Sequence, residues 1–184
     1  MQKHESAFTL VELLVAMAVA AIVLTLGVPG FGRIIEQNQL SAYTNQLVSS
    51  LHFARSEAIR RNQSIKVCHS DNASACNGTG GYENGWVIFI DDDGDDTVDS
   101  TEELLRVNEN LPSNYTFNVN GGVDSFSFTA KGRTDSQGTF VLCKDGNLTK
   151  ARAIIIGPGG RTRLAPLNSS GVPEQSIGTP IASC

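Results

Sequence analysis

The sequence lacks the motifs by which many enzyme families are recognised. It contains no H-E-x-x-H zinc motif, no G-x-S-x-G nucleophile turn and no Walker A lysine. Histidine, the commonest general acid or base, occurs only at His4, His52 and His69. We therefore predict that the protein is not an enzyme.

An excess of positive charge is also missing. The 19 acidic residues outnumber the 14 basic ones and give a formal net charge of -5, which argues against a general nucleic-acid coat. With 40% hydrophobic and 18% charged residues, the chain is not a disordered polymer, a collagen or a multi-span membrane protein. Its 184 residues leave room for one hydrophobic anchor and one small soluble domain.

Closely spaced cysteine pairs are absent as well, which argues against a structural zinc site. The four cysteines suit disulfides formed in an oxidising compartment, and they allow three pairings. The sequence favours Cys68 with Cys76, which closes a short polar loop. It also favours Cys143 with Cys184, which ties the tail 166–184, rich in proline and glycine, to the rest of the domain.

The apolar residues concentrate near the N-terminus. Residues 8–28 carry a single charged side chain, Glu12, and about 20 helical residues suffice to cross a bilayer. A cleaved secretory signal has a shorter apolar run that ends at a small-residue cleavage site, which this segment lacks. We predict one helix from Phe8 to Arg61, with residues 8–29 in the membrane and residues 30–62 packed on the head. The soluble half has one stripe at helical spacing: Leu40, Thr44, Leu47, Leu51, Ala54 and Ala58.

The residues just before this run form a specific motif. Ala7-Phe8-Thr9-Leu10-Val11-Glu12 resembles the processing signal of type IV prepilins, although the usual residue before the cut is Gly rather than Ala7. The resemblance implies that a prepilin peptidase removes the leader 1–7 and that Phe8 becomes N-methylated. An ionised carboxylate in hydrocarbon costs several kcal/mol, so Glu12 is expected to face a free amine at Phe8 during filament assembly.

The remaining sequence alternates short β-branched or aromatic runs with Gly- and Asn-rich turns. This pattern predicts an α+β fold: one long N-terminal helix packed on a small antiparallel β head, residues 63–165. The expected strands are Ser64–His69, Gly85–Asp91, Leu104–Asn108, Tyr115–Asn120, Ser125–Thr129, Thr139–Lys144, Ala153–Gly157 and Thr162–Ala165.

The order of these pieces resembles the GspH/FimT group of type IV minor pilins and pseudopilins, with the greatest likeness to FimT and FimU. The resemblance rests on three elements: the helix end 55–61, the run 85–91 before an acidic loop, and Ile154–Ile156 followed by a Gly-Arg turn. It implies a type IV pilin-like fold, a single-pass protein of the bacterial inner membrane with its head in the periplasm, and later incorporation into a surface pilus. Its expected partners are other minor and major pilins.

An acidic loop follows residue 90. Asp91, Asp93, Asp95, Asp99 and Glu102 occupy positions 1, 3, 5, 9 and 12 of a calcium loop, but position 6 is Asp96 where EF-hands have Gly. A solvated hairpin loop is the favoured interpretation, and calcium binding is the alternative. Calcium is the only candidate cofactor.

Basic residues gather near the C-terminus. Arg161 and Arg163 lie two apart on an extended segment, so both guanidiniums should project to one side and suit phosphates. Residues 157–160 are expected to present bare backbone N–H groups beside them. Between residues 131 and 163, two acidic residues face seven basic ones: Lys131, Arg133, Lys144, Lys150, Arg152, Arg161 and Arg163.

In FimT-like proteins a G-R-x-R element is associated with DNA binding in natural transformation, and Gly160, Arg161 and Arg163 match it. The resemblance therefore implies a minor pilin that binds double-stranded DNA without sequence preference, with Lys150 and Arg152 assisting. Two alternatives remain open. GspH relatives carry a Gly-Arg turn with no DNA role, so the protein is alternatively a FimU-like assembly pilin, or a type II secretion pseudopilin.

Overall fold

A computed structural model of the chain describes residues 8–76, 80–120, 123, 125–176 and 178–184, with residues 26–30 described by their backbone alone. The predicted leader, including Ala7, lies outside these residues. The chain divides into two compact units, Met1–Gln39 and Leu40–Cys184. Each unit is described below by itself.

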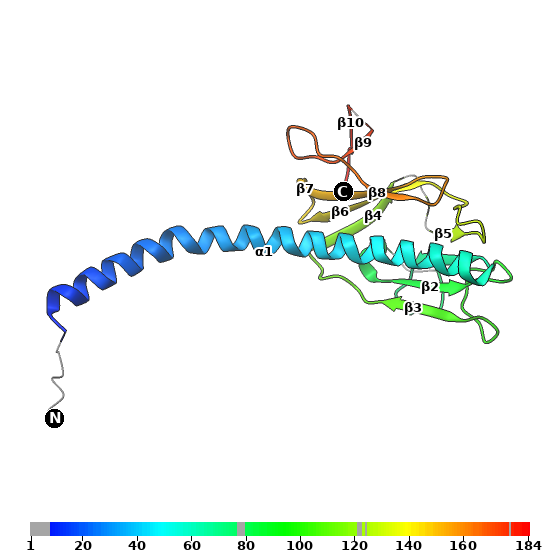
Figure 1. The fold of residues 1–184 in the computed structure, drawn as a ribbon, viewed down its shortest axis with the longest axis horizontal. Helices are drawn as coiled ribbons and strands as arrows, with labels where there is room; N and C mark the ends of the chain where they lie inside the picture. The colour runs from blue at the N-terminus through cyan, green and yellow to red at the C-terminus, as the bar shows by residue number, and fades with distance from the viewer. Residues whose placement is uncertain (1–7, 77–79, 121–122, 124, 177) are drawn as a thin grey trace, which may run out of the picture. The chain divides into compact units, whose positions relative to one another are not determined.

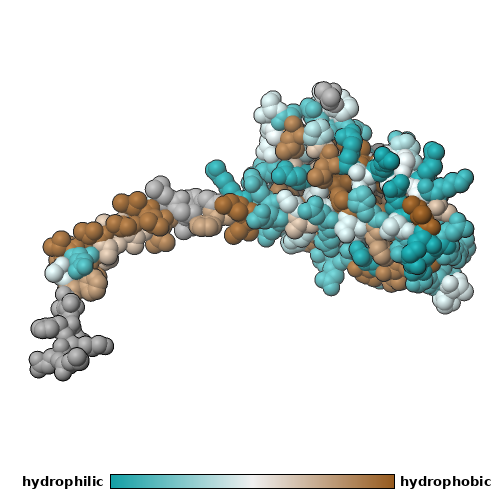
Figure 2. Space-filling view, in the orientation of Figure 1, coloured by the Kyte–Doolittle hydropathy of each residue, from teal (hydrophilic) through white to brown (hydrophobic). Residues whose placement is uncertain are grey.

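Helix α1 (Leu10–Arg61) begins in the first unit. Thr9 caps its start, because the Thr9 hydroxyl oxygen accepts a hydrogen bond from the backbone N–H of Glu12. All described side chains from residue 8 to residue 25 are exposed, and Figure 2 shows that most of them are apolar.

Within the described residues, no helix is both long enough and apolar enough to cross a bilayer. Residues 26–29 of the predicted membrane segment 8–29 lie outside the residues whose side chains are described.

The rest of α1 belongs to the second unit, and its predicted stripe is confirmed. Each of the six stripe residues is buried, and Leu47, Ala54 and Ala58 have no exposed surface at all. The helix ends where Asn62 adopts a left-handed backbone conformation (φ 57). The N–H of Gln63 then donates to the carbonyl of Ala58, which closes the last turn.

Two four-stranded antiparallel sheets make up most of the second unit, and Figure 1 shows α1 alongside both. The first sheet has the order β3-β2-β1-β5 and the second the order β4-β6-β7-β8. The tail adds a separate hairpin, β9 and β10. The strands are β1 (Ile65–His69), β2 (Trp86–Ile90), β3 (Leu104–Asn108), β4 (Tyr115–Asn120), β5 (Ser125–Phe128), β6 (Gly138–Lys144), β7 (Asn147–Ile156), β8 (Thr162–Leu164), β9 (Glu174–Ser176) and β10 (Thr179–Pro180), with one 3-10 turn, η1 (Tyr82–Asn84).

The predicted fold class is confirmed, and all eight expected strands are present. The main differences are at β7 and in the tail. β7 begins at Asn147, six residues earlier than expected, because its polar N-terminal half pairs with β6 across a register irregularity. The tail contains a strand pair that its proline content did not suggest, held by pairing between Thr179 and Ser176.

The inner faces of both sheets and the stripe of α1 form one hydrophobic core. Phe140 of β6 lies at its centre, with its ring centroid 5.0 Å from those of Tyr82 and Phe126 and 6.2 Å from that of Phe117. Edge-to-face and tilted aromatic packing of this kind adds to the stabilisation from burial alone.

Both disulfides join the pairs that the sequence favoured. Cys68 bonds to Cys76 and Cys143 bonds to Cys184, with Cα–Cα distances of 5.4 and 5.8 Å. Each bond seals a small apolar cluster on the outer face of a sheet. In the second cluster, Ile181 of the tail packs against Val141, Cys143, Ala151 and Ala153, so the tail covers the outer face of β6 and β7.

Ion pairs tie the end of α1 to the segment before β3. Glu57 accepts hydrogen bonds from Arg60 and Arg61, and Arg61 also binds Glu103. These bonds, with the one from Arg60 as the largest cause and the one from Arg61 next, lower the pKa of Glu57 from 4.5 to about 2.

The central position of Phe140 predicts a large cost for its removal. Phe140→Ala should lower the free energy of unfolding by about 3–5 kcal/mol, because the substitution leaves a cavity among three other aromatic rings. Leu164→Ala is the control, since this side chain is 55% exposed and its loss should cost less than about 1 kcal/mol. Urea unfolding measures both, and equal costs would contradict this account of the core.

The lowered pKa of Glu57 predicts an acid-sensitive contribution to stability. A carboxylate whose folded pKa lies below its unfolded value stabilises the fold above the unfolded pKa and loses that effect as pH falls through the folded one. Wild type should therefore exceed Glu57→Gln in urea midpoint above pH 4.5, and the difference should vanish as pH falls to about 2. A difference that stays constant across this window would refute the assignment.

Candidate nucleic-acid interface

The β7–β8 hairpin carries the two arginines that the sequence singled out. Arg163 pairs with Ile155 across the hairpin, whereas Ile154 and Ile156 point into the core, so Arg163 lies on the outer face of the sheet. Its Nη2 donates to the backbone oxygen of Gln175 on β9 at 3.0 Å. Arg161, two residues earlier, is exposed and by strand alternation projects to the same side.

The expectation of a row of bare backbone amides in the turn is wrong for Gly157 and Gly160. The N–H of Gly160 donates to the oxygen of Gly157 at 2.9 Å, and the N–H of Gly157 donates to the oxygen of Arg161 at 3.2 Å. Pro158 has no N–H to offer. The turn itself therefore uses the N–H groups of Gly157 and Gly160, and Gly159 is the one residue of the turn whose N–H takes no part in these bonds.

Gly160 has a packing role that is independent of any ligand. It is buried, and its φ of 69° lies in the left-handed region. A Cβ atom at this position would lie 2.3 Å from the oxygen of Gly132. That same oxygen accepts a hydrogen bond from Nε of Arg55 at 2.8 Å. The glycine therefore lets the β7–β8 turn, the β5–β6 loop and α1 meet.

This contact places Arg161 close to two basic residues, Lys131 and Arg133, that the sequence analysis did not include among the predicted DNA-binding residues. Lys131 and Arg133 flank Gly132 and are both exposed, while Arg161 directly follows Gly160. No sequence signal connects Gly132 with Gly160, since they lie in different loops. The cluster formed by Lys131, Arg133 and Arg161, hereafter the basic cluster, follows from the tertiary structure.

The structure does not bring Arg152 to the side of Arg163. Arg152 pairs with Leu142, a core residue, so this part of β7 directs Arg152 to the face opposite Arg163. Lys150 lies two residues earlier on β7, where the register with β6 is irregular, and is exposed. The sequence analysis predicted that Lys150 and Arg152 assist Arg161 and Arg163 in DNA binding. That role requires all four side chains on one surface, and Arg152 does not share the surface of Arg163.

The acidic loop partly matches its predicted geometry. Carboxylate oxygens of Asp91, Asp93 and Asp95 all lie within 4.8 Å of one another, and within the described residues this group does not include Asp99 or Glu102. Asp96, at the position where an EF-hand has Gly, adopts a φ of 65°, so the backbone turns as glycine would. Whether calcium binds stays a prediction.

Lys66 supplies a positive charge at this loop. It is 8% exposed, and its ammonium contacts the carboxylates of Asp91 and Asp96. Burial by itself lowers the pKa of Lys66, but the hydrogen bonds that its ammonium donates to the two carboxylates outweigh this effect, so the net pKa is raised. Lys66 is therefore charged at neutral pH and neutralises part of the loop.

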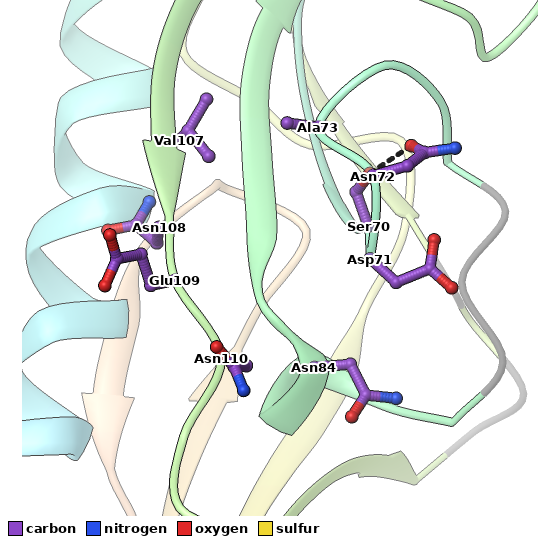
Figure 3. Close-up of a pocket in the computed structure, with 9 residues that line it drawn as sticks. All are labelled: Ser70, Asp71, Asn72, Ala73, Asn84, Val107, Asn108, Glu109 and Asn110. Atoms are coloured by element: carbon purple, nitrogen blue, oxygen red, sulfur yellow. Dashed lines mark hydrogen bonds between the residues drawn. The ribbon is translucent and has the colours of Figure 1, made fainter.

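A pocket of about 530 Å³ lies at the end of β3, and residues 70–73 of the loop closed by the Cys68–Cys76 disulfide form part of its lining. Figure 3 shows the hydrogen bond between Ser70 and Asn72 at one side of it and Asn84 and Asn110 near each other at another. Ligand pockets usually have a predominantly apolar wall, whereas among the described residues that line this one only Ala73 and Val107 are apolar. We assign it no ligand.

The contact at Gly160 makes a direct prediction. Gly160→Ala should destabilise the protein by about 1–3 kcal/mol, because alanine disfavours the left-handed region and its Cβ would overlap the oxygen of Gly132. Gly159→Ala, one residue away in the same turn, is the matched control, since nothing lies within 4 Å of its Cβ position. Thermal unfolding of the two variants tests this, and comparable stability would rule out the packing role.

Comparisons with known proteins agree with this architecture. A protein-family model described as Type II transport protein GspH matches residues 43–160, and the prokaryotic N-terminal methylation motif matches residues 2–28. A comparison with curated protein sequences found no match.

Three solved structures are similar to the chain. Two are crystal forms of the type IV minor pilin FimU of Pseudomonas aeruginosa. One has a TM-score of 0.61 at 23% identity, covering 78% of this chain and 98% of that chain. The other has a TM-score of 0.57 at 24% identity, covering 74% and 98%. The minor pseudopilin EpsH from the Type 2 Secretion System of Vibrio cholerae has a TM-score of 0.48 at 11% identity, covering 68% and 94%.

At these identities the FimU structures show a shared fold. The family assignment rests on the GspH model, which spans well over half of the chain, and on the methylation motif. The chain belongs to the GspH family of minor pilins and pseudopilins.

Proposed function

We propose that the protein is a minor pilin of a type IV pilus whose head binds double-stranded DNA during natural transformation. Family membership and the methylation motif support the pilin part of this proposal, together with the fold shared with FimU, whose structure is described as that of a type IV minor pilin. The observation that carries the DNA-binding part is the pair of exposed arginines on one side of the β7–β8 hairpin.

The N-terminal segment provides the route into a filament. In this proposal a prepilin peptidase removes residues 1–7 at the inner membrane, residues 8–29 anchor the chain there, and the head resides in the periplasm. Phe8 becomes the methylated terminus. Glu12 then stabilises the packing of helices from neighbouring pilins, because its carboxylate gains a counter-charge in a medium where an isolated charge is unfavourable.

DNA binding would depend on phosphate contacts. Arginine presents a planar fork of donors that matches a phosphate, and Arg161 and Arg163 offer two such forks side by side. Within residues 40–184, no described Phe, Tyr or Trp side chain is classed as exposed, so platforms for stacking on bases are scarce. Binding should therefore be independent of sequence and strongly dependent on salt.

A second candidate function is FimU-like assembly, in which the head contacts other pilins and binds no DNA. The packing role of Gly160 favours it, because the Gly-Arg turn would then need no ligand to explain its glycine. A transformation defect with normal piliation would support the DNA-binding function, and lost piliation would support assembly. A role in a type II secretion pseudopilus remains a third and less favoured proposal.

The DNA-binding function predicts a measurable salt slope. The full-length protein in an uncharged detergent should bind duplex DNA with log affinity falling linearly with log salt concentration, by about 0.9 per phosphate contacted. Arg161→Ala plus Arg163→Ala should flatten the slope by about 1.8. The control is Arg161→Lys plus Arg163→Lys, which keeps the charge and should retain most of the slope. No binding by wild type at low salt would refute the DNA-binding function and leave the assembly pilin.

A further inference from the structure

The contact between Gly132 and Gly160 concentrates positive charge at one place on the head. The Cα atoms of Lys131, Arg133 and Arg161 are each one peptide unit, about 3.8 Å, from one of these two glycines. All three side chains are exposed. The basic cluster therefore draws on two loops that are remote in the sequence.

A groove continues from this cluster across the outer surface of α1. It has a volume of about 530 Å³. Its lining includes Ser49, His52 and Ser56, together with the guanidinium groups of Arg55 on α1 and Arg106 on β3. Arg55 donates to Gly132 within the contact described above. Arg106 of β3 lies over the ring of Phe53, with its Cζ 4.2 Å from the ring centroid. No carboxylate is among the described residues that line the groove.

Several carboxylates near these elements in sequence are engaged, among them Glu103 just before β3, which Arg61 binds, whereas Glu109 just after β3 is exposed. Asp135, on the β5–β6 loop, accepts a hydrogen bond from the backbone N–H of Ser127, and Glu57 on α1 is held by Arg60 and Arg61. The side chains along this path thus offer cations and hydroxyl groups. The opposite direction, along β7, leads to Arg152 on the other face of the sheet.

We propose that the DNA backbone runs from the basic cluster across the α1 groove to Arg106, and not along β7 toward Lys150 and Arg152. This inference rests on the proposed DNA-binding function and adds three phosphate-contacting residues to it: Lys131, Arg133 and Arg106. Thr162 of the hairpin contacts His52 of this groove, whereas Arg163 lies on the outer face of the sheet and is held by the oxygen of Gln175.

The test compares two variants that remove the same charge from different places. Lys131→Ala plus Arg133→Ala should lower the salt slope of duplex binding by up to about 1.8, whereas Lys150→Ala plus Arg152→Ala should leave it unchanged. Arg106→Gln should lower it by about 0.9. Each variant is used as the full-length protein in an uncharged detergent, with its unfolding midpoint and disulfide pairing checked against wild type.

The outcomes separate this inference from the function on which it depends. If wild type binds DNA and the Arg161/Arg163 variant flattens the slope, but the Lys131/Arg133 variant does not, the path is wrong and the function stands. A loss of slope in the Lys150/Arg152 variant alone would place the path along β7 and overturn the inference. If wild type binds no DNA at low salt, both proposals fail together.

Discussion

The burial of one face of α1 against both sheets is the interaction on which the rest of the head depends. Leu47 and Leu51 fill the space between the sheets, and Ala54 and Ala58 let the strands approach the helix closely near its end. Because this inner face is fully packed, the rotation of the helix about its axis is set. The outer face must then present His52, Phe53 and Arg55, and each of these holds a different element: β8, β3 and the β5–β6 loop.

The packing of the head also determines which charged side chains are paired with one another and which remain exposed on the surface. The chain is acidic as a whole, with a net charge of -5. Much of its acidic loop is paired internally, because Lys66 and Arg61 reach Asp91, Asp96 and Glu103. Among the ion pairs of the described residues, none involves Lys131, Arg133 or Arg161. A negative net charge of the whole chain is therefore compatible with a local surface that attracts phosphate.

The tail links stability to the candidate interface. Its disulfide to Cys143 and the burial of Ile181 hold it against β6 and β7, and its strand β9 accepts the hydrogen bond from Arg163. One arginine of the pair is therefore oriented by a segment that depends on an oxidised cysteine bond. A head formed in an oxidising compartment, as the sequence predicts, meets this requirement.

The sequence by itself determined the long helix, the eight strands of the two sheets and both disulfides. These features follow from local periodicity, turn residues and loop length, which act over a few positions. Only the tertiary structure decided that Gly160 meets Gly132, that Arg152 and Arg163 lie on opposite faces, and that the tail forms a hairpin. Such contacts join residues far apart in the chain, and they depend on how the sheets pack around α1, which no local pattern encodes.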